Sequence, residues 1–220
     1  MDDKKWERWG LHGGLIGVAL LVATVLEVGA PPDSDATAPE IADWYADKND
    51  NIQIGVVLVA LAVIGIVWWF GSLFRYLRRA EGGEPRLSVI AAFGVLLSGA
   101  MAMIAFAINS AVAMRIADVG TDAGIFFAIQ NGLLGMSAVG DAILIAAVSA
   151  IALRTKFLPD WLAYAGAAVA VLQLVGALAI ATQNTAISFV GFIAFLLWLA
   201  WIAAVSLVLI ERKTEPTAAA

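Results

Sequence analysis

Six long apolar stretches recur along the chain, and they constrain its fold more than any other feature. An apolar stretch of about 20 residues is long enough to cross the hydrocarbon core of a bilayer as a helix. Charged or turn-forming residues separate the stretches. The sequence therefore predicts an all-α, polytopic membrane protein, a bundle of six transmembrane helices over about residues 11–30, 52–74, 87–112, 125–153, 161–181 and 189–210.

The composition leaves little room for a separate soluble domain. The 220 residues are 62% hydrophobic and only 14% charged, whereas a soluble domain has about 25% charged residues. We therefore expect a short N-terminal segment (1–10), one transmembrane domain (11–210) and a C-terminal tail (211–220).

The distribution of lysine and arginine predicts the orientation of the helices. Two of the thirteen basic residues, Lys48 and Arg115, fall in loops on one side of the predicted membrane. Cytoplasmic loops carry an excess of basic residues. We therefore expect both termini to be cytoplasmic and the protein to be a multi-pass protein of the cell inner (plasma) membrane. The other eleven lie on the opposite side: Lys4, Lys5, Arg8, Arg75, Arg78, Arg79, Arg86, Arg154, Lys156, Arg212 and Lys213.

The loop 31–51 has the pattern of a short amphipathic helix. Thr37 and Glu40 have the spacing of a capping box, and Pro39 suits a first helical turn. Such a helix would lie on the outer membrane surface, with Trp44 and Tyr45 among the lipid headgroups. Two roles are open for it, a solvated acidic cap and a lid over an outward-facing opening.

Asp141 lies in the middle of the apolar stretch GMSAVGDAILIAAVSA. A carboxyl group at the bilayer centre costs on the order of 3 kcal/mol, so such residues usually face the protein interior. Asp141 lies 13 positions before Arg154, and Gln173 lies 13 positions after Asp160. At about 1.5 Å per residue, both would sit roughly 20 Å from the cytoplasmic end of their helices.

The same counting places Ser98 and Trp198 at this depth, which gives a midplane polar layer of Ser98, Asp141, Gln173 and Trp198. Two interpretations of the layer are open. A dry Asp141 would stay protonated and hold two helices together through a hydrogen bond to Gln173. An Asp141 that water reaches would bind a proton, a cation or a cationic substrate.

A second group of polar residues lies nearer the predicted outer face and suggests an outer vestibule above Asp141. Its members are Glu27, Asn109, Gln130, Asn131 and Arg115, and Arg115 is close enough in sequence to pair with Glu27. The alternative is that these residues only solvate the helix ends.

Several chemistries are disfavoured by the residues present, so we expect no enzyme, no cofactor and no metal site. The chain has no cysteine and one histidine, His12. His12 and Ser137 would lie at different depths, which disfavours a serine hydrolase. Asp141 has no second carboxyl group at its depth for an aspartyl protease. The loop RYLRRAEGGEPR is interpreted as a topology determinant that touches anionic lipid, not as a nucleic-acid site.

Three stretches resemble a bacterial family of six-helix membrane proteins that carries a domain-of-unknown-function label. They are PEIADWYADKND in the outer loop, WWFGSLFRYLRRAEG at the end of the second span, and RTKFLPDWLAYAGAAVAVLQLVG at the start of the fifth. The resemblance covers about residues 10 to 210. It implies the six-helix architecture and a bacterial inner-membrane location, and it implies no activity.

Two functions from different classes follow as hypotheses. The first is a non-enzymatic protein of the lipid bilayer that binds or moves a small solute, a proton or a lipid through a polar cavity around Asp141. The alternative is a structural or accessory subunit that docks a partner protein, with Asp141 as an internal packing hydrogen bond. A homo-oligomer is compatible with either hypothesis.

Overall fold

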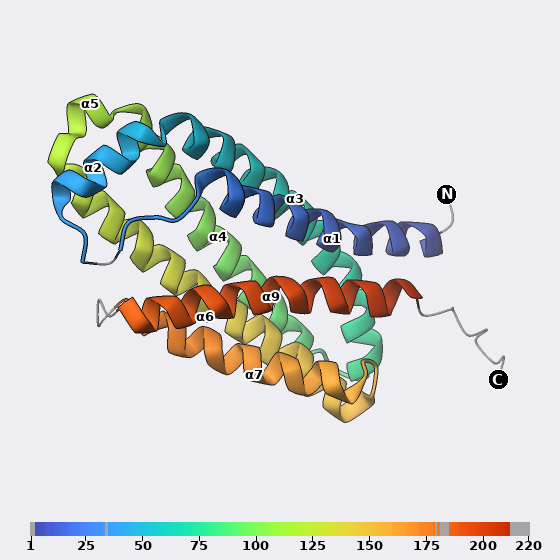
Figure 1. The fold of residues 1–220 in the computed structure, drawn as a ribbon. Helices are drawn as coiled ribbons and strands as arrows, with labels where there is room; N and C mark the ends of the chain where they lie inside the picture. Colours follow the sequence, from blue (N-terminus) through green and yellow to red (C-terminus); the bar gives the residue numbers. More distant parts are fainter. Residues whose placement is uncertain (1–2, 34, 179, 181–184, 212–220) are drawn as a thin grey trace, which may run out of the picture.

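The protein folds as a bundle of α-helices (Figure 1). The computed structural model describes residues 3–33, 35–178, 180 and 185–211. Three short elements, α2 (Ala38–Asp47), α5 (Ile116–Val119) and the 3-10 helix η1 (Gly120–Asp122), lie at one end. The long helices are α1 (Asp3–Val28), α3 (Asn49–Glu81), α4 (Leu87–Met114), α6 (Ala123–Thr155), α7 (Asp160–Ala177) and α9 (Thr185–Glu211).

Six of the described helices are long and apolar enough to cross a membrane, which confirms the predicted all-α six-span architecture. Several extend beyond the apolar stretches from which they were predicted. Helix α3, for example, continues through the basic sequence RYLRRAE to Glu81. Arginine and glutamate are good helix formers, so the helix does not stop where the apolar stretch does.

The six long helices form a closed ring in which each one contacts its neighbours. The order around the ring is α1, α3, α4, α6, α7 and α9, and α9 returns to α1. Helix α6 also contacts α3 and is the most buried of the spans. The largest hydrophobic core gathers Trp69 and Leu73 of α3, Leu144 and Ile145 of α6, and Ile202 of α9.

The two ends of the bundle differ in charge. The arginine end is the end that carries Arg75, Arg78, Arg79, Arg86 and Arg154, and the helices at both ends of the chain begin or finish there (Figure 1). The α2 end carries α2, α5 and η1, together with Lys48 and Arg115. The structure thus places these described basic residues as the loop pattern predicts. The cytoplasmic location of the arginine end stays a prediction.

Helix α2 forms where its sequence pattern predicts it. The Glu40 carboxylate accepts hydrogen bonds from the backbone N–H and the hydroxyl of Thr37, at 2.7 and 2.8 Å. Both bonds favour the charged carboxylate and hold the pKa of Glu40 below its usual range. The Tyr45 side chain is fully buried against the bundle, and the headgroup level of Trp44 and Tyr45 stays a prediction. Ile41, one turn earlier, is buried with it.

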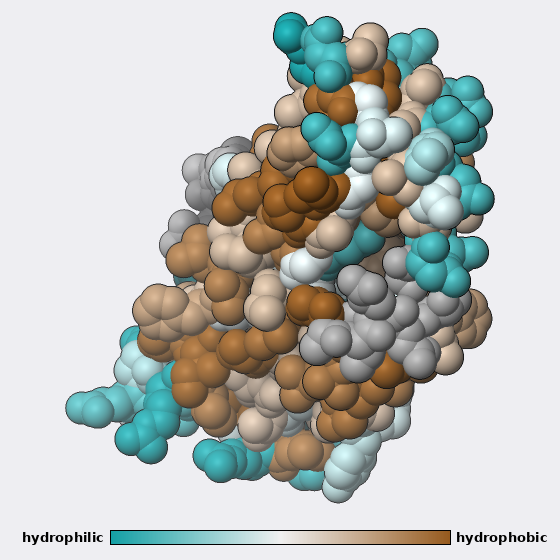
Figure 2. Space-filling view, turned by 90° about the vertical axis from the view of Figure 1, so that its left-hand side faces the viewer, coloured by the Kyte–Doolittle hydropathy of each residue, from teal (hydrophilic) through white to brown (hydrophobic). Residues whose placement is uncertain are grey.

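Figure 2 looks at the molecule from the α2 end. Hydrophilic residues gather along the top and right of that view and at its lower left, and apolar residues cover the middle of its left side. Many large apolar side chains are exposed on the described helices, for example Phe93 and Leu96 of α4 and Val57 of α3. An exposed apolar surface of this kind is the surface that lipid covers in a membrane protein.

Candidate functional site

The side chain of Asp141 lies between α4 and α6 and is hydrogen-bonded to serine. Ser98 Oγ donates to Asp141 Oδ1 at 2.7 Å, and Ser98 Oγ and Ser137 Oγ lie 3.0 Å apart. A hydroxyl has one proton to donate. Because the Ser98 proton is used in the hydrogen bond to Asp141, Ser137 is the donor in the hydrogen bond between the two serines. The three oxygens form a chain that ends on the carboxyl group, and all three residues are buried.

Two glycines bring the backbones of α4 and α6 together at this position. A methyl group added to Gly94 would lie 2.8 Å from the carbonyl oxygen of Gly140 and 2.6 Å from the backbone nitrogen of Leu144. Added to Gly140, it would lie 2.6 Å from the nitrogen of Ser98. Small residues allow such close approach of membrane helices. The glycines therefore place the short side chains of Ser98 and Asp141 within reach of each other.

Among the described residues, the helices around Asp141 supply hydroxyl groups and no counter-charge at its level. Helix α3, which also contacts α6, carries its charged residues in its first turn and from Arg75 onward. Helix α4 contains no charged residue, and the other charged residue of α6 is Arg154 in its last turn. The titratable residues of α7 are Asp160, in its first turn, and Tyr164. A buried charge needs a paired charge or several hydrogen bonds. The site as folded therefore suits a neutral, protonated carboxyl group better than a carboxylate.

Gln173 and Trp198 lie at another interface. Gln173 Nε2 donates to the carbonyl oxygen of Ala194 in α9, at 3.4 Å. Trp198 is also buried, and its ring lies 5.8 Å from that of Phe195. The predicted Asp141–Gln173 hydrogen bond is therefore wrong. Gln173 faces α9 because it lies one turn from Gly176, where α7 and α9 pack closely.

Two of the predicted vestibule residues lie along the same contact as Asp141. Asn109 follows Ser98 by 11 positions in α4, and Gln130 precedes Asp141 by 11 positions in α6. Eleven residues are close to three helical turns, so each returns to the same helix face. Both side chains are buried. We call Ser98, Asn109, Gln130, Ser137 and Asp141 the polar seam.

The polar seam runs from Asp141 only toward the α2 end. There, the Tyr45 hydroxyl donates to Gln130 Oε1 at 3.0 Å, and Asn109 Oδ1 has no hydrogen-bond partner among the described residues. Toward the arginine end, most buried side chains of the two helices are apolar, as at Ala91, Leu144 and Val148. The buried serines there face other elements, because Ser88 bonds to Glu81 and Ser149 lies against Gly166 of α7. Access to Asp141 is therefore more polar from the α2 end.

The other three vestibule residues are not part of this seam. Glu27 Oε1 accepts a hydrogen bond from Asn51 Nδ2 at 2.9 Å. Arg115 pairs with Asp118 at 2.8 Å, and both are exposed, so the predicted Arg115–Glu27 pair is wrong. Asn131 directly follows the buried Gln130, and consecutive residues of a helix point about 100° apart. The Asn131 side chain is therefore exposed.

Sequence reasoning missed two residues of the site, Ser137 and Tyr45. Ser137 lies one turn before Asp141, and this spacing was the available signal. Tyr45 comes from α2, and no local pattern shows that it contacts Gln130, 85 positions away. Burial raises the pKa of the Tyr45 phenol, so it stays a hydrogen-bond donor.

Comparisons of the chain with protein-family models, with curated proteins and with solved structures find no match. The candidate function therefore rests on the geometry of the site.

Proposed function

We propose that this integral membrane protein binds and releases a proton at Asp141, and that the proton controls the contact between α4 and α6. The observation that carries the proposal is the Ser137–Ser98–Asp141 hydrogen-bond chain at the closest approach of the two helices. An ionisable residue inside a membrane marks a functional site by default. Among a solute, a lipid and a proton, the proton alone needs no cavity between Gly94 and Gly140.

We call this proton-controlled contact between α4 and α6 the switch. Its physical basis is the free-energy cost of burying a charged carboxylate. With its proton, Asp141 is neutral and is accommodated by one hydrogen bond from Ser98. Without the proton, the carboxylate needs water or further donors. Because the polar seam leads toward the α2 end, we expect α4 and α6 to separate there and admit water, while the apolar half toward the arginine end stays packed.

The chain has no cysteine, so pairs of spin labels can be introduced without background. Ala107 of α4 and Ala128 of α6 are exposed on the α2 half, and Ile90 and Ala146 are exposed on the arginine half. In reconstituted protein, the Ala107–Ala128 label distance is expected to lengthen as the pH is raised. The Ile90–Ala146 distance is the matched control and is expected to stay constant.

Asp141→Asn keeps the shape of the side chain and cannot lose a proton to become a carboxylate. In this variant the Ala107–Ala128 distance is expected to stay short at every pH. A wild-type distance that does not change with pH would overturn the proposal. A pH response of the same size in Asp141→Asn would assign the switch to another group and would also overturn it.

A second candidate is an accessory subunit that docks a partner protein. In it Asp141 would be a permanent lock, that is, a hydrogen bond that always holds α4 and α6 together. The close Gly94–Gly140 contact favours it, because a rigid bundle suits a scaffold. In that case Asp141→Asn is expected to be as stable as wild type, and neither label distance responds to pH. Asp141→Ala, which has no hydrogen-bonding group, would lower the thermal stability.

A further inference from the structure

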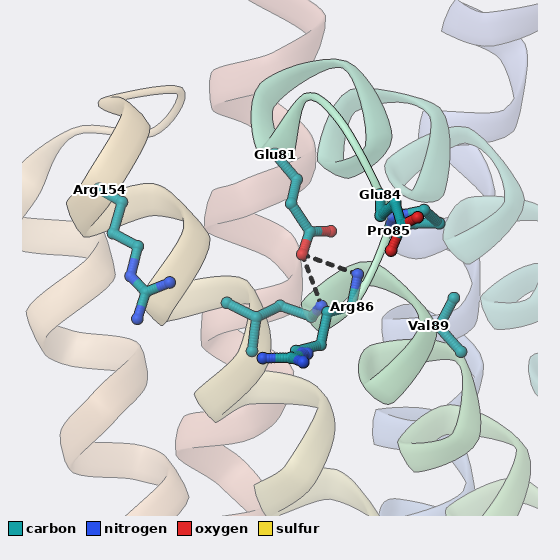
Figure 3. A pocket seen from close by; sticks show the side chains of 7 residues that line it. Glu81, Glu84, Pro85, Arg86, Val89 and Arg154 are labelled. Atoms are coloured by element: carbon teal, nitrogen blue, oxygen red, sulfur yellow. Dashed lines mark hydrogen bonds between the residues drawn. The ribbon is translucent and has the colours of Figure 1, made fainter.

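A pocket of about 600 Å³ opens at the arginine end, on the side of the bundle away from Asp141's polar seam. It lies between the end of α3, the start of α4 and the end of α6 (Figure 3). These helix ends are where the candidate membrane spans begin or finish. A bilayer that covers the apolar parts of these spans would place its headgroups near the pocket.

Two arginines, one just before α4 and one in α6, line this pocket. Arg86 precedes the first residue of α4, and Arg154 lies in the last turn of α6. Figure 3 shows the Arg154 side chain coming from α6 and the Arg86 side chain from the start of α4, and both line the same pocket. Both are exposed, and no ion pair engages either within the described part of the chain. Two neighbouring guanidinium groups of like charge favour an anion between them.

One of the two carboxylates in the pocket lining, Glu81, is hydrogen-bonded to the first turn of α4. Glu81 accepts hydrogen bonds from the backbone N–H groups of Arg86, Leu87 and Ser88, at 3.0, 2.6 and 3.0 Å. The Ser88 hydroxyl donates to it as well, at 2.7 Å. Glu81 therefore caps the N-terminus of α4 and satisfies its free N–H groups. Glu84 also lines the pocket, on the far side of the loop from Arg154 (Figure 3).

We propose that Arg86 and Arg154 bind the phosphate group of a phospholipid headgroup. Guanidinium groups form strong, charge-assisted hydrogen bonds with phosphate oxygens. Basic pockets between membrane helices at the headgroup level are suited to such lipids. Leu87 and Val89 add apolar surface to the lining, against which the glycerol and upper acyl chains would pack. The inference is independent of the function proposed for Asp141.

The test uses the full chain in detergent, titrated with phosphatidylglycerol and read out by native mass spectrometry. Diacylglycerol with the same acyl chains is the control ligand, because it keeps the acyl chains and glycerol backbone and lacks the phosphoglycerol headgroup. The double variant Arg86→Gln/Arg154→Gln is expected to weaken phosphatidylglycerol binding by at least about tenfold, since both charge-assisted bonds to the phosphate are lost. Equal binding of the two lipids, or unchanged binding by the double variant, would overturn the proposal.

Arg78→Gln is the matched control variant. Arg78 is exposed at the same end and does not line the pocket, so its loss removes the same charge and is expected to leave the affinity unchanged. An equal loss for Arg78→Gln would mean a diffuse electrostatic attraction and no site. Inorganic phosphate is the second ligand; if it binds as tightly as phosphatidylglycerol, the ligand is free phosphate and the lipid assignment is wrong.

Glu84→Gln tests the same site without removing a ligand-binding group. Glu84 is an exposed carboxylate in the pocket lining, so its neutralisation removes a repulsion from the phosphate. We expect tighter binding of phosphatidylglycerol at low salt, and a smaller gain at high salt because the group is solvated. Weaker binding by this variant would contradict the assignment.

Discussion

Gly94 and Gly140 face each other so closely that a methyl group on either one would lie 2.8 Å from the carbonyl oxygen of the other. This reciprocal contact sets the distance between α4 and α6. It also places Ser98 and Asp141, which are neighbours of these glycines along the helices, in hydrogen-bonding contact. The polar group inside the membrane and the packing of the two helices are therefore one structural feature.

Gly140→Ala is expected to destabilise the bundle. Its methyl group would lie 2.6 Å from the backbone nitrogen of Ser98, and the backbone of α4 has to move away. Overpacking of this kind typically costs about 1–3 kcal/mol. Gly132→Ala in the same helix is the control, because no atom lies within 4 Å of the added group. Thermal unfolding in detergent compares the two, and equal effects would argue against the close contact.

Ser98→Ala is expected to lower the stability by about 1 kcal/mol, the usual size of a hydrogen bond between membrane helices. The variant removes the donor to Asp141 and the acceptor for Ser137. Ser206→Ala is the control, because that buried hydroxyl bonds to the carbonyl of Ile202 in its own helix. A double-mutant cycle of Ser98→Ala with Asp141→Ala isolates the pair, because each single variant removes the hydrogen bond between the two side chains. Strictly additive effects would show that the two side chains are not coupled.

Tyr45→Phe is expected to loosen α2 from α6. Below about pH 10, Tyr45 is neutral in the folded and the unfolded chain, and the variant lacks only the bond to Gln130, worth about 1 kcal/mol. Burial raises the pKa of folded Tyr45, so at higher pH the unfolded chain releases a proton that the folded chain keeps.

Because the unfolded chain releases the Tyr45 proton more readily than the folded chain, the stability of the wild type falls as the pH rises above about 10. Phenylalanine does not titrate, so the advantage of wild type over Tyr45→Phe is expected to shrink there. Chemical denaturation at a series of pH values measures the difference. An advantage that grows with alkaline pH would contradict the burial of the Tyr45 hydroxyl.

The architecture was predictable because long apolar stretches have few alternatives. A stretch such as 189–210 can satisfy its backbone groups in lipid only as a helix. The cap of α2 was predictable for a similar reason, since the Thr37–Glu40 pairing depends on residues three positions apart.

The sequence predicted the level of the site residues along their helices, and it did not predict which neighbouring helix each side chain faces. Counting residues placed Ser98 and Asp141 at one level, and the structure brings them into contact. The same counting does not show how each helix is rotated about its own axis, and so it does not show which neighbour a side chain faces. It therefore paired Asp141 with Gln173, whereas Gln173 bonds to α9. Rotation depends on the partners of each helix, which single-helix patterns do not encode.

The most direct test of the central claim is an infrared titration of the carboxyl group of Asp141 in lipid-reconstituted protein. We expect a carbonyl band of a protonated acid that is absent from Asp141→Asn and that disappears reversibly as the pH is raised while the protein stays folded. The loss of this band should accompany the lengthening of the Ala107–Ala128 distance. A band of Asp141 that keeps its intensity over the whole pH range of the folded protein would contradict the claim, and Asp141 would then be a permanent lock.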